Sequence, residues 1–88
     1  MLNIYEIKYP NGEKEWCTGS TTLHALFNFT NKSNCDLHDL QEAEIKKINM
    51  RDWHRYHIDE EDGPGISFDE WMKENGEEPG IICGTFYL

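Results

Sequence analysis

The sequence predicts a single α+β domain over residues 1–88, with the element order β-β-α-β-α-β and both helices on one face of a mainly antiparallel sheet. This prediction depends on three observations: an N-terminal turn between two strand-like segments, two segments with helix-start signals, and an apolar C-terminal run. With 38% hydrophobic and 12% aromatic residues, the 88-residue chain has enough apolar surface to form one small core.

The N-terminal segments predict a β-hairpin. Residues 2–9 (LNIYEIKY) are rich in β-branched and aromatic side chains, which are typical of a strand. Pro10-Asn11-Gly12 predicts a turn, because proline fixes φ and Asn-Gly accepts positive φ. Residues 13–19 (EKEWCTG) then return antiparallel, with Trp16 and Cys17 on opposite faces.

A helix is predicted over residues 21–31. The hydroxyl-rich segment before it offers an N-cap, and Leu23, Leu26 and Phe27 follow at helical spacing as an apolar stripe. The polar residues 31–36 (NKSNCD) are expected to form a loop.

Residues 36–58 allow two interpretations. They can form one long helix, with a stripe through Ile45 and Ile48, or a strand at 43–49 followed by an extended piece at 53–58. The strand is favoured, because a lone hairpin is marginally stable and a helix packed on it requires a third strand to complete the sheet.

The C-terminal third predicts a capped helix and a strand. Ser67 and Glu70 have the spacing of a capping box, an apolar stripe follows, and Asn75-Gly76 ends the helix. The nearly continuous apolar run at 81–88 (IICGTFYL) predicts a central strand.

The net charge of −9 is concentrated in one segment. Residues 59–78 contain nine acids and one base, so they carry −8 and the rest of the chain −1. This disfavours direct binding to nucleic acid or an anionic membrane, which both require a basic footprint. It favours a basic partner protein, although a solvated surface without a partner has the same signature. The candidate partner-binding residues are Asp59, Glu60, Glu61, Asp62, Asp69, Glu70, Glu74, Glu77 and Glu78.

A calcium-binding loop matches the acidic segment only in part. Counted from Asp59, acids occupy positions 1, 3 and 12 of the twelve-residue frame. Gly63 offers no side-chain ligand at position 5, and Pro64 stands at position 6, where the sharp turn requires glycine. We therefore expect no tight calcium binding.

A second pattern has the spacing of a tetrahedral zinc site. Cys35-x-x-His38 is followed, after fifteen residues, by His54-x-x-His57. If 53–58 is extended, the two histidines project to opposite faces and cannot share one ion; if it is a helical turn, they lie together. We expect no cofactor and no bound metal. The alternative is a zinc ion held by Cys35, His38, His54 and His57.

No motif indicates catalysis. The chain contains no nucleophile elbow, P-loop or dinucleotide fingerprint, and Cys17 and Cys83 fall in predicted strands, where cysteine is usually a small buried hydrophobe. Three cysteines, no signal-like N-terminus and no run of about 18 apolar residues predict a cytoplasmic protein with reduced thiols.

These observations favour a non-enzymatic binding module or inhibitor that docks its acidic segment on a basic, nucleic-acid-binding surface of another protein. In size and charge the chain is similar to compact acidic proteins of phages and mobile elements that inhibit restriction or CRISPR nucleases. A small zinc-binding domain is the alternative function, and a small hydrolase that uses the carboxylates is the third.

Overall fold

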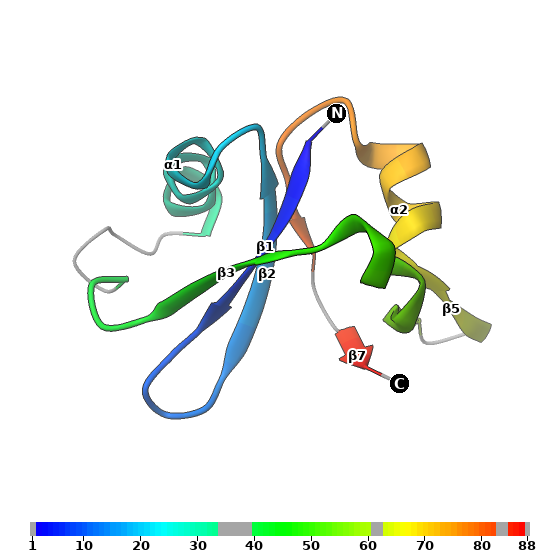
Figure 1. The fold of residues 1–88 in the computed structure, drawn as a ribbon, viewed down its shortest axis with the longest axis horizontal. Helices are drawn as coiled ribbons and strands as arrows, with labels where there is room; N and C mark the ends of the chain where they lie inside the picture. Colours follow the sequence, from blue (N-terminus) through cyan, green and yellow to red (C-terminus); the bar gives the residue numbers. More distant parts are fainter. Residues whose placement is uncertain (1, 34–39, 61–62, 83–84, 88) are drawn as a thin grey trace.

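The computed structural model describes residues 2–33, 40–60, 63–82 and 85–87. Within these residues the chain forms two antiparallel sheets, two α-helices and one 3-10 helix (Figure 1). The α+β class is confirmed, and the element order agrees broadly with β-β-α-β-α-β.

The first sheet has the strand order β3-β1-β2-β6. Its strands are β1 (Asn3–Lys8), β2 (Lys14–Gly19), β3 (Glu44–Ile48) and β6 (Ile81–Ile82). β1 and β2 form the predicted hairpin, and Gly12 in its turn has a φ of 93°, which glycine adopts without strain. β3 pairs with the other edge of β1, so the strand favoured at 43–49 is confirmed and a single helix across 36–58 is wrong.

The second sheet was only partly predicted. It has the order β5-β4-β7, with β4 (Tyr56–Glu60), β5 (Gly63–Ser67) and β7 (Thr85–Tyr87). The start of the acidic segment, for which no strand was predicted after residue 58, therefore supplies the end of β4 and all of β5, and Ile58 lies opposite Ile66. The extended piece expected at 53–58 begins only at Tyr56, because the 3-10 helix η1 (Met50–Arg55) precedes it.

The apolar C-terminal run does not form one central strand. It contributes β6 to the edge of the first sheet and β7 to the edge of the second. The apolar side chains of β6 face both ways, since Ile81 packs against one core cluster and Ile82 belongs to the other. Its continuous hydrophobicity therefore reflects burial on two faces of an edge strand.

Helix α1 (Thr22–Ser33) begins as predicted and ends later. Its first turn is capped by Thr21, whose Oγ1 accepts a hydrogen bond from the His24 N–H at 3.1 Å. Residues 31–33, expected to be loop, are helical. The buried face agrees with the predicted stripe only at Leu26, which packs against the core beside the buried Ala25 and Phe29. Leu23 and Phe27 are 73% and 58% exposed.

Helix α2 (Phe68–Asn75) has the predicted start and end. The Oγ of Ser67 accepts a hydrogen bond from the Glu70 N–H at 3.4 Å, and the Gly76 N–H donates to the Met72 carbonyl at 2.8 Å. Phe68 and Met72 are buried.

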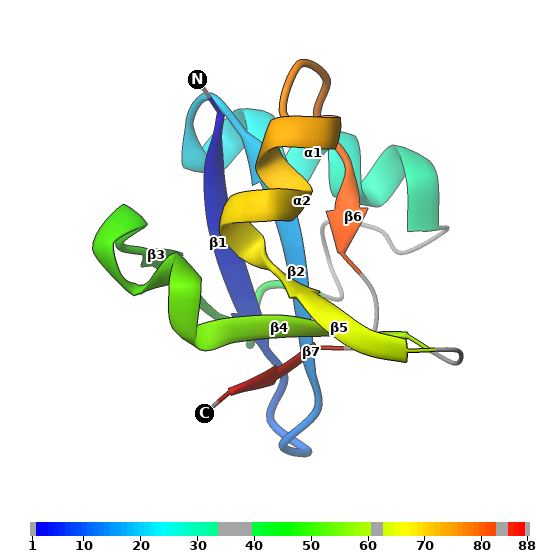
Figure 2. The ribbon, with the colours of Figure 1, turned by 90° about the vertical axis from the view of Figure 1, so that its right-hand side faces the viewer.

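The two helices lie on opposite faces of the first sheet, not on one face as predicted. One core cluster joins α1 to Tyr5, Ile7 and Cys17, and the other joins α2 and the second sheet to Ile4 and its neighbours. Alternate residues of β1 supply the two clusters, because successive strand side chains point to opposite faces. Figures 1 and 2 show α1 on one side of the first sheet and α2 with β4 and β5 on the other.

Candidate functional site

The acidic candidates that the structure describes in full lie on α2 and the turn after it. Asp69 and Glu70 occupy the first turn of α2, where negative charge is stabilised by the helix dipole. Glu74, Glu77 and Glu78 are exposed at the other end of the helix. Of the remaining four, Asp59 and Glu60 belong to β4, but the structure does not describe their side chains. Glu61 and Asp62 lie outside the described residues.

A recess of about 360 Å³ lies where α2 ends and the chain turns towards β6. Its lining combines carboxylates with an aromatic ring and backbone, and consists of Trp71, Glu74, Asn75, Glu77, Glu78, Pro79, Gly80 and Ile81. Trp71 is half-buried and packs against the core beneath α2, so its ring is held in place. The Asn75 Nδ2 donates to the Trp71 carbonyl oxygen at 3.2 Å, which fixes the last turn of the helix beside the recess.

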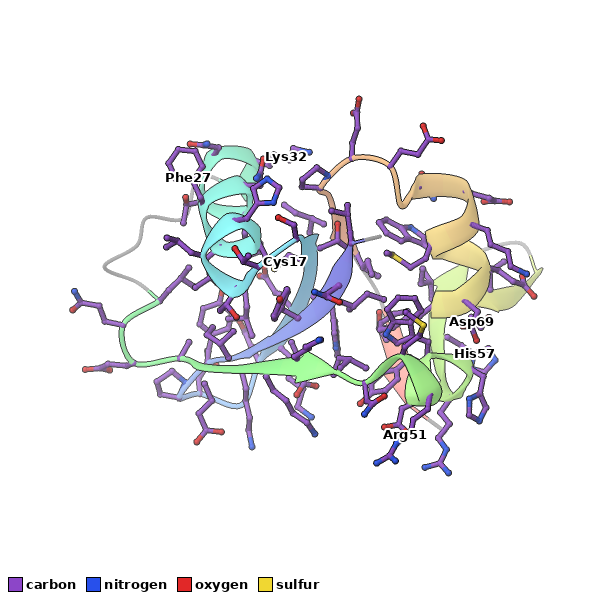
Figure 3. The ribbon with its side chains drawn as sticks, turned by 45° about the horizontal axis from the view of Figure 1, so that its top comes forward. Cys17, Phe27, Lys32, Arg51, His57 and Asp69 are labelled. Carbon is purple, nitrogen blue, oxygen red and sulfur yellow. The ribbon has the colours of Figure 1, made fainter. Side chains whose placement is uncertain are left out.

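One base approaches this recess from the other helix. Lys32, in the last turn of α1, donates from its Nζ to the carbonyl oxygen of Pro79. Figure 3 shows Lys32 on the side of α1 that faces the loop after α2. The three glutamates of the recess are exposed, so the lining itself carries three negative charges.

The structure separates parts of the acidic segment that are continuous in sequence. β5 begins at Gly63 at one edge of the second sheet, and α2 follows directly after β5 (Figure 2). The recess lies at the other end of α2. Glu74, Glu77 and Glu78 therefore form a distinct group, which we call the recess glutamates. Trp71 and Pro79, which sequence reasoning did not assign to a site, are its aromatic and backbone walls.

The predicted metal ligands are only partly described. Cys35 and His38 lie outside the described residues, and no group of three His, Cys, Asp or Glu side chains suited to a metal ion occurs among the residues that are described. His54 is exposed at the end of η1, whereas His57 lies in β4 opposite Ser67. The backbone of the calcium frame is extended and paired over Gly63–Ser67 instead of wrapping around an ion.

The described cysteine has the properties of a core residue. Cys17 is fully buried between the first sheet and α1 (Figure 3), and burial, with a smaller contribution from Glu15, raises the pKa of its thiol to about 12. The thiolate that nucleophilic catalysis requires is therefore strongly disfavoured. The expectation that Cys17 is a small buried hydrophobe is confirmed; Cys83 lies outside the described residues.

His24 is occupied in a structural role. Its Nδ1 accepts a hydrogen bond from the Ser20 N–H at 3.1 Å and lies 2.9 Å from the Ser20 Oγ. These contacts join the residues before α1 to its first turn.

No family model, curated protein or solved structure matches this chain. Among the described residues, none of the helices is long and apolar enough to cross a membrane.

Proposed function

We propose that this chain is a non-enzymatic binding module that docks its acidic surface on a basic surface of a partner protein. The observation that supports this proposal best is the recess at the end of α2. Three exposed glutamates line it together with the half-buried Trp71, within a segment of net charge −8.

The recess combines the two features that recognise an arginine or lysine side chain. Carboxylates accept charge-assisted hydrogen bonds from a guanidinium or ammonium group, and arginine pairs with them in a bidentate geometry. Trp71 is in the same lining, and a cation over the face of a tryptophan ring gains about 0.5–1 kcal/mol at exposed sites and about 2 kcal/mol when desolvated. A basic side chain of the partner is the natural occupant of such a recess.

The partner class follows from the same chemistry. Strongly basic protein surfaces commonly bind nucleic acid, so an acidic module on such a surface competes with the phosphate backbone. The chain would then act in the cytoplasm as an inhibitor of a nucleic-acid-binding protein. Its size and charge are similar to those of the anti-restriction and anti-CRISPR proteins of phages and mobile elements, a likeness of class only.

The proposal is tested by removing the recess charges. In the triple variant Glu74→Gln, Glu77→Gln, Glu78→Gln, we expect weaker and less salt-dependent binding of a deca-arginine peptide, measured by calorimetry at several salt concentrations. The matched control replaces three exposed acids elsewhere, Glu13, Glu42 and Glu44, and so removes the same charge.

If the recess variant and the control bind alike, charge at the recess has no special role. If both bind as tightly as the parent protein across the salt series, the acidic surface has no docking function. Capture from a host lysate then identifies the natural partner, which should be retained by the control and lost by the recess variant. Release of that partner's nucleic acid on binding would identify the inhibitory activity.

A further inference from the structure

A second cleft lies where the first sheet meets the second. It has a volume of about 360 Å³. Its lining residues come from β1, β2, β3, β4 and β7 and are Glu6, Lys14, Trp16, Lys46, Tyr56 and Thr85. This volume falls in the range of small-molecule sites, about 300–1,000 Å³.

Two buried polar atoms of the cleft residues have no hydrogen-bond partner within the described part of the chain. They are the Nε1 of Trp16 and the Oγ1 of Thr85. Such atoms are rare in folded proteins and call for an explanation, for instance a water or an unseen ligand. The indole N–H can only donate, so whatever satisfies Trp16 must present an acceptor.

The charge of the cleft has the opposite sign to that of the chain. Lys14 and Lys46 contribute two positive charges and Glu6 one negative charge. The Lys14 Nζ lies 3.8 Å from the Glu6 Oε1, and Lys46 lies directly opposite Glu6 in the sheet register. The lining therefore has a net charge of +1, which one monoanion neutralises.

The remaining walls are aromatic. Trp16 packs against the core, and the Tyr56 ring stacks on Phe68 with centroids 5.0 Å apart and planes 12° apart. Both rings are thus held in place beside the lysines. A space of this size also exceeds what a single inorganic anion fills, so the geometry favours a ligand with a flat apolar body.

We propose that this cleft binds a small organic monocarboxylate with a flat apolar body. The carboxylate pairs with Lys46, while Lys14 offsets Glu6. The Trp16 indole N–H and the Thr85 hydroxyl are covered in the free protein, so a small movement of the cleft wall on binding lets them donate hydrogen bonds to the carboxylate. The body of the ligand lies against Trp16 and Tyr56. This site is independent of the recess glutamates and of the docking function proposed for them.

Two-dimensional ¹H–¹⁵N NMR of the full chain tests this proposal with benzoate as the probe. Trp16, Trp53 and Trp71 each give one indole N–H resonance, which Trp→Phe variants assign. At constant ionic strength, we expect benzoate to move the Trp16 resonance saturably and to leave Trp71, in the recess, unmoved. Acetate, which lacks the flat body, and inorganic phosphate should act more weakly.

Charge variants of the cleft are expected to change benzoate affinity in opposite directions. Lys46→Gln should weaken benzoate binding roughly two- to fivefold, as expected for a single exposed ion pair. Glu6→Gln should tighten binding, because it removes the negative charge of the lining. Lys47→Gln is the matched control, since this neighbouring lysine of β3 points to the other face and does not line the cleft.

Two results would overturn the proposal. One is a Trp16 resonance that none of the three anions moves at tens of millimolar, which would mean that the cleft holds water only. The other is an equal loss of benzoate affinity in Lys46→Gln and Lys47→Gln, which would mean that benzoate responds to the overall charge of the protein and not to a lysine of the cleft.

Discussion

Thr18 and Gly80 are joined by reciprocal hydrogen bonds across 62 residues of sequence. The Thr18 N–H donates to the Gly80 carbonyl oxygen at 2.9 Å, and the Gly80 N–H donates to the Thr18 Oγ1 at 2.8 Å. The Thr18 side chain is fully buried. This pair fixes the chain after α2 to the edge of β2, and so positions the wall of the recess that Gly80 contributes.

We predict that Thr18→Val destabilises the fold by about 1–3 kcal/mol, because the Gly80 N–H loses its acceptor while the side-chain shape is preserved. Urea unfolding measures the change in free energy. Thr18→Ser, which keeps the hydroxyl, is the control and should retain the hydrogen bond. Equal stability of the valine variant and the parent would show that water replaces the threonine oxygen.

Gly19 permits the close approach of α1 to the first sheet. A Cβ at this position would lie 2.5 Å from the backbone nitrogen of Ala25, which cannot move without shifting the helix. We predict that Gly19→Ala costs about 1–3 kcal/mol in thermal or urea unfolding, as overpacking does.

Gly80→Ala is the matched control for this prediction. Its Cβ would lie 3.6 Å from the Trp71 ring, an ordinary contact, so little destabilisation is expected. A similar loss of stability in both variants would show that backbone conformation, not the approach of α1, determines the cost.

Local signals in the sequence predicted the elements that depend on local physics. The turn at Gly12 and the Ser67 cap of α2 need only neighbouring residues, and both are present. The buried face of α1 depends on tertiary packing instead. Because the helix approaches the sheet closely at Gly19, the small Ala25 and the ring of Phe29 face the core, and Leu23 and Phe27 remain exposed.

The pairing of β4 with β5 was hard to predict because most of its sequence opposes strand formation. Acids, glycine and proline are depleted in strands, and they occupy most positions between Ile58 and Ile66, the two apolar residues that pair. Pro64 is tolerated because β5 is an edge strand.

The acidic segment of the candidate site could be found from composition, but its geometry could not. Trp71 belongs to the apolar stripe predicted after Ser67, but its place in the recess depends on the turn that brings Pro79 and Gly80 beside it. The second cleft collects residues from five strands of two sheets, an arrangement that no local pattern encodes.

The Ser67 cap gives a further prediction. Ser67→Ala should destabilise the protein by about 0.5–2 kcal/mol, and the 3.4 Å length of its hydrogen bond to the Glu70 N–H favours the lower end of that range. Ser67→Asp restores an acceptor at the helix N-terminus and should recover the lost stability in the same unfolding measurement. An alanine variant as stable as the parent would show that the cap is redundant.

Glu15 predicts a dependence of stability on pH. Partial burial, and to a smaller extent the charge of Glu13, raise the pKa of its carboxyl above the ordinary value of 4.5. The folded state therefore binds the proton more readily than the unfolded state. The resulting penalty on folding is absent below the unfolded pKa, and it is fully present once the pH has risen above the folded pKa.

We predict that Glu15→Gln raises the melting temperature at pH 7, and that its advantage over the parent shrinks as the pH falls towards 4. Glu42→Gln, which removes an exposed acid, is the control for the general effect of reducing a net charge of −9. If the two variants shift the melting temperature equally at every pH, the burial of Glu15 does not contribute and the gain comes from net charge alone.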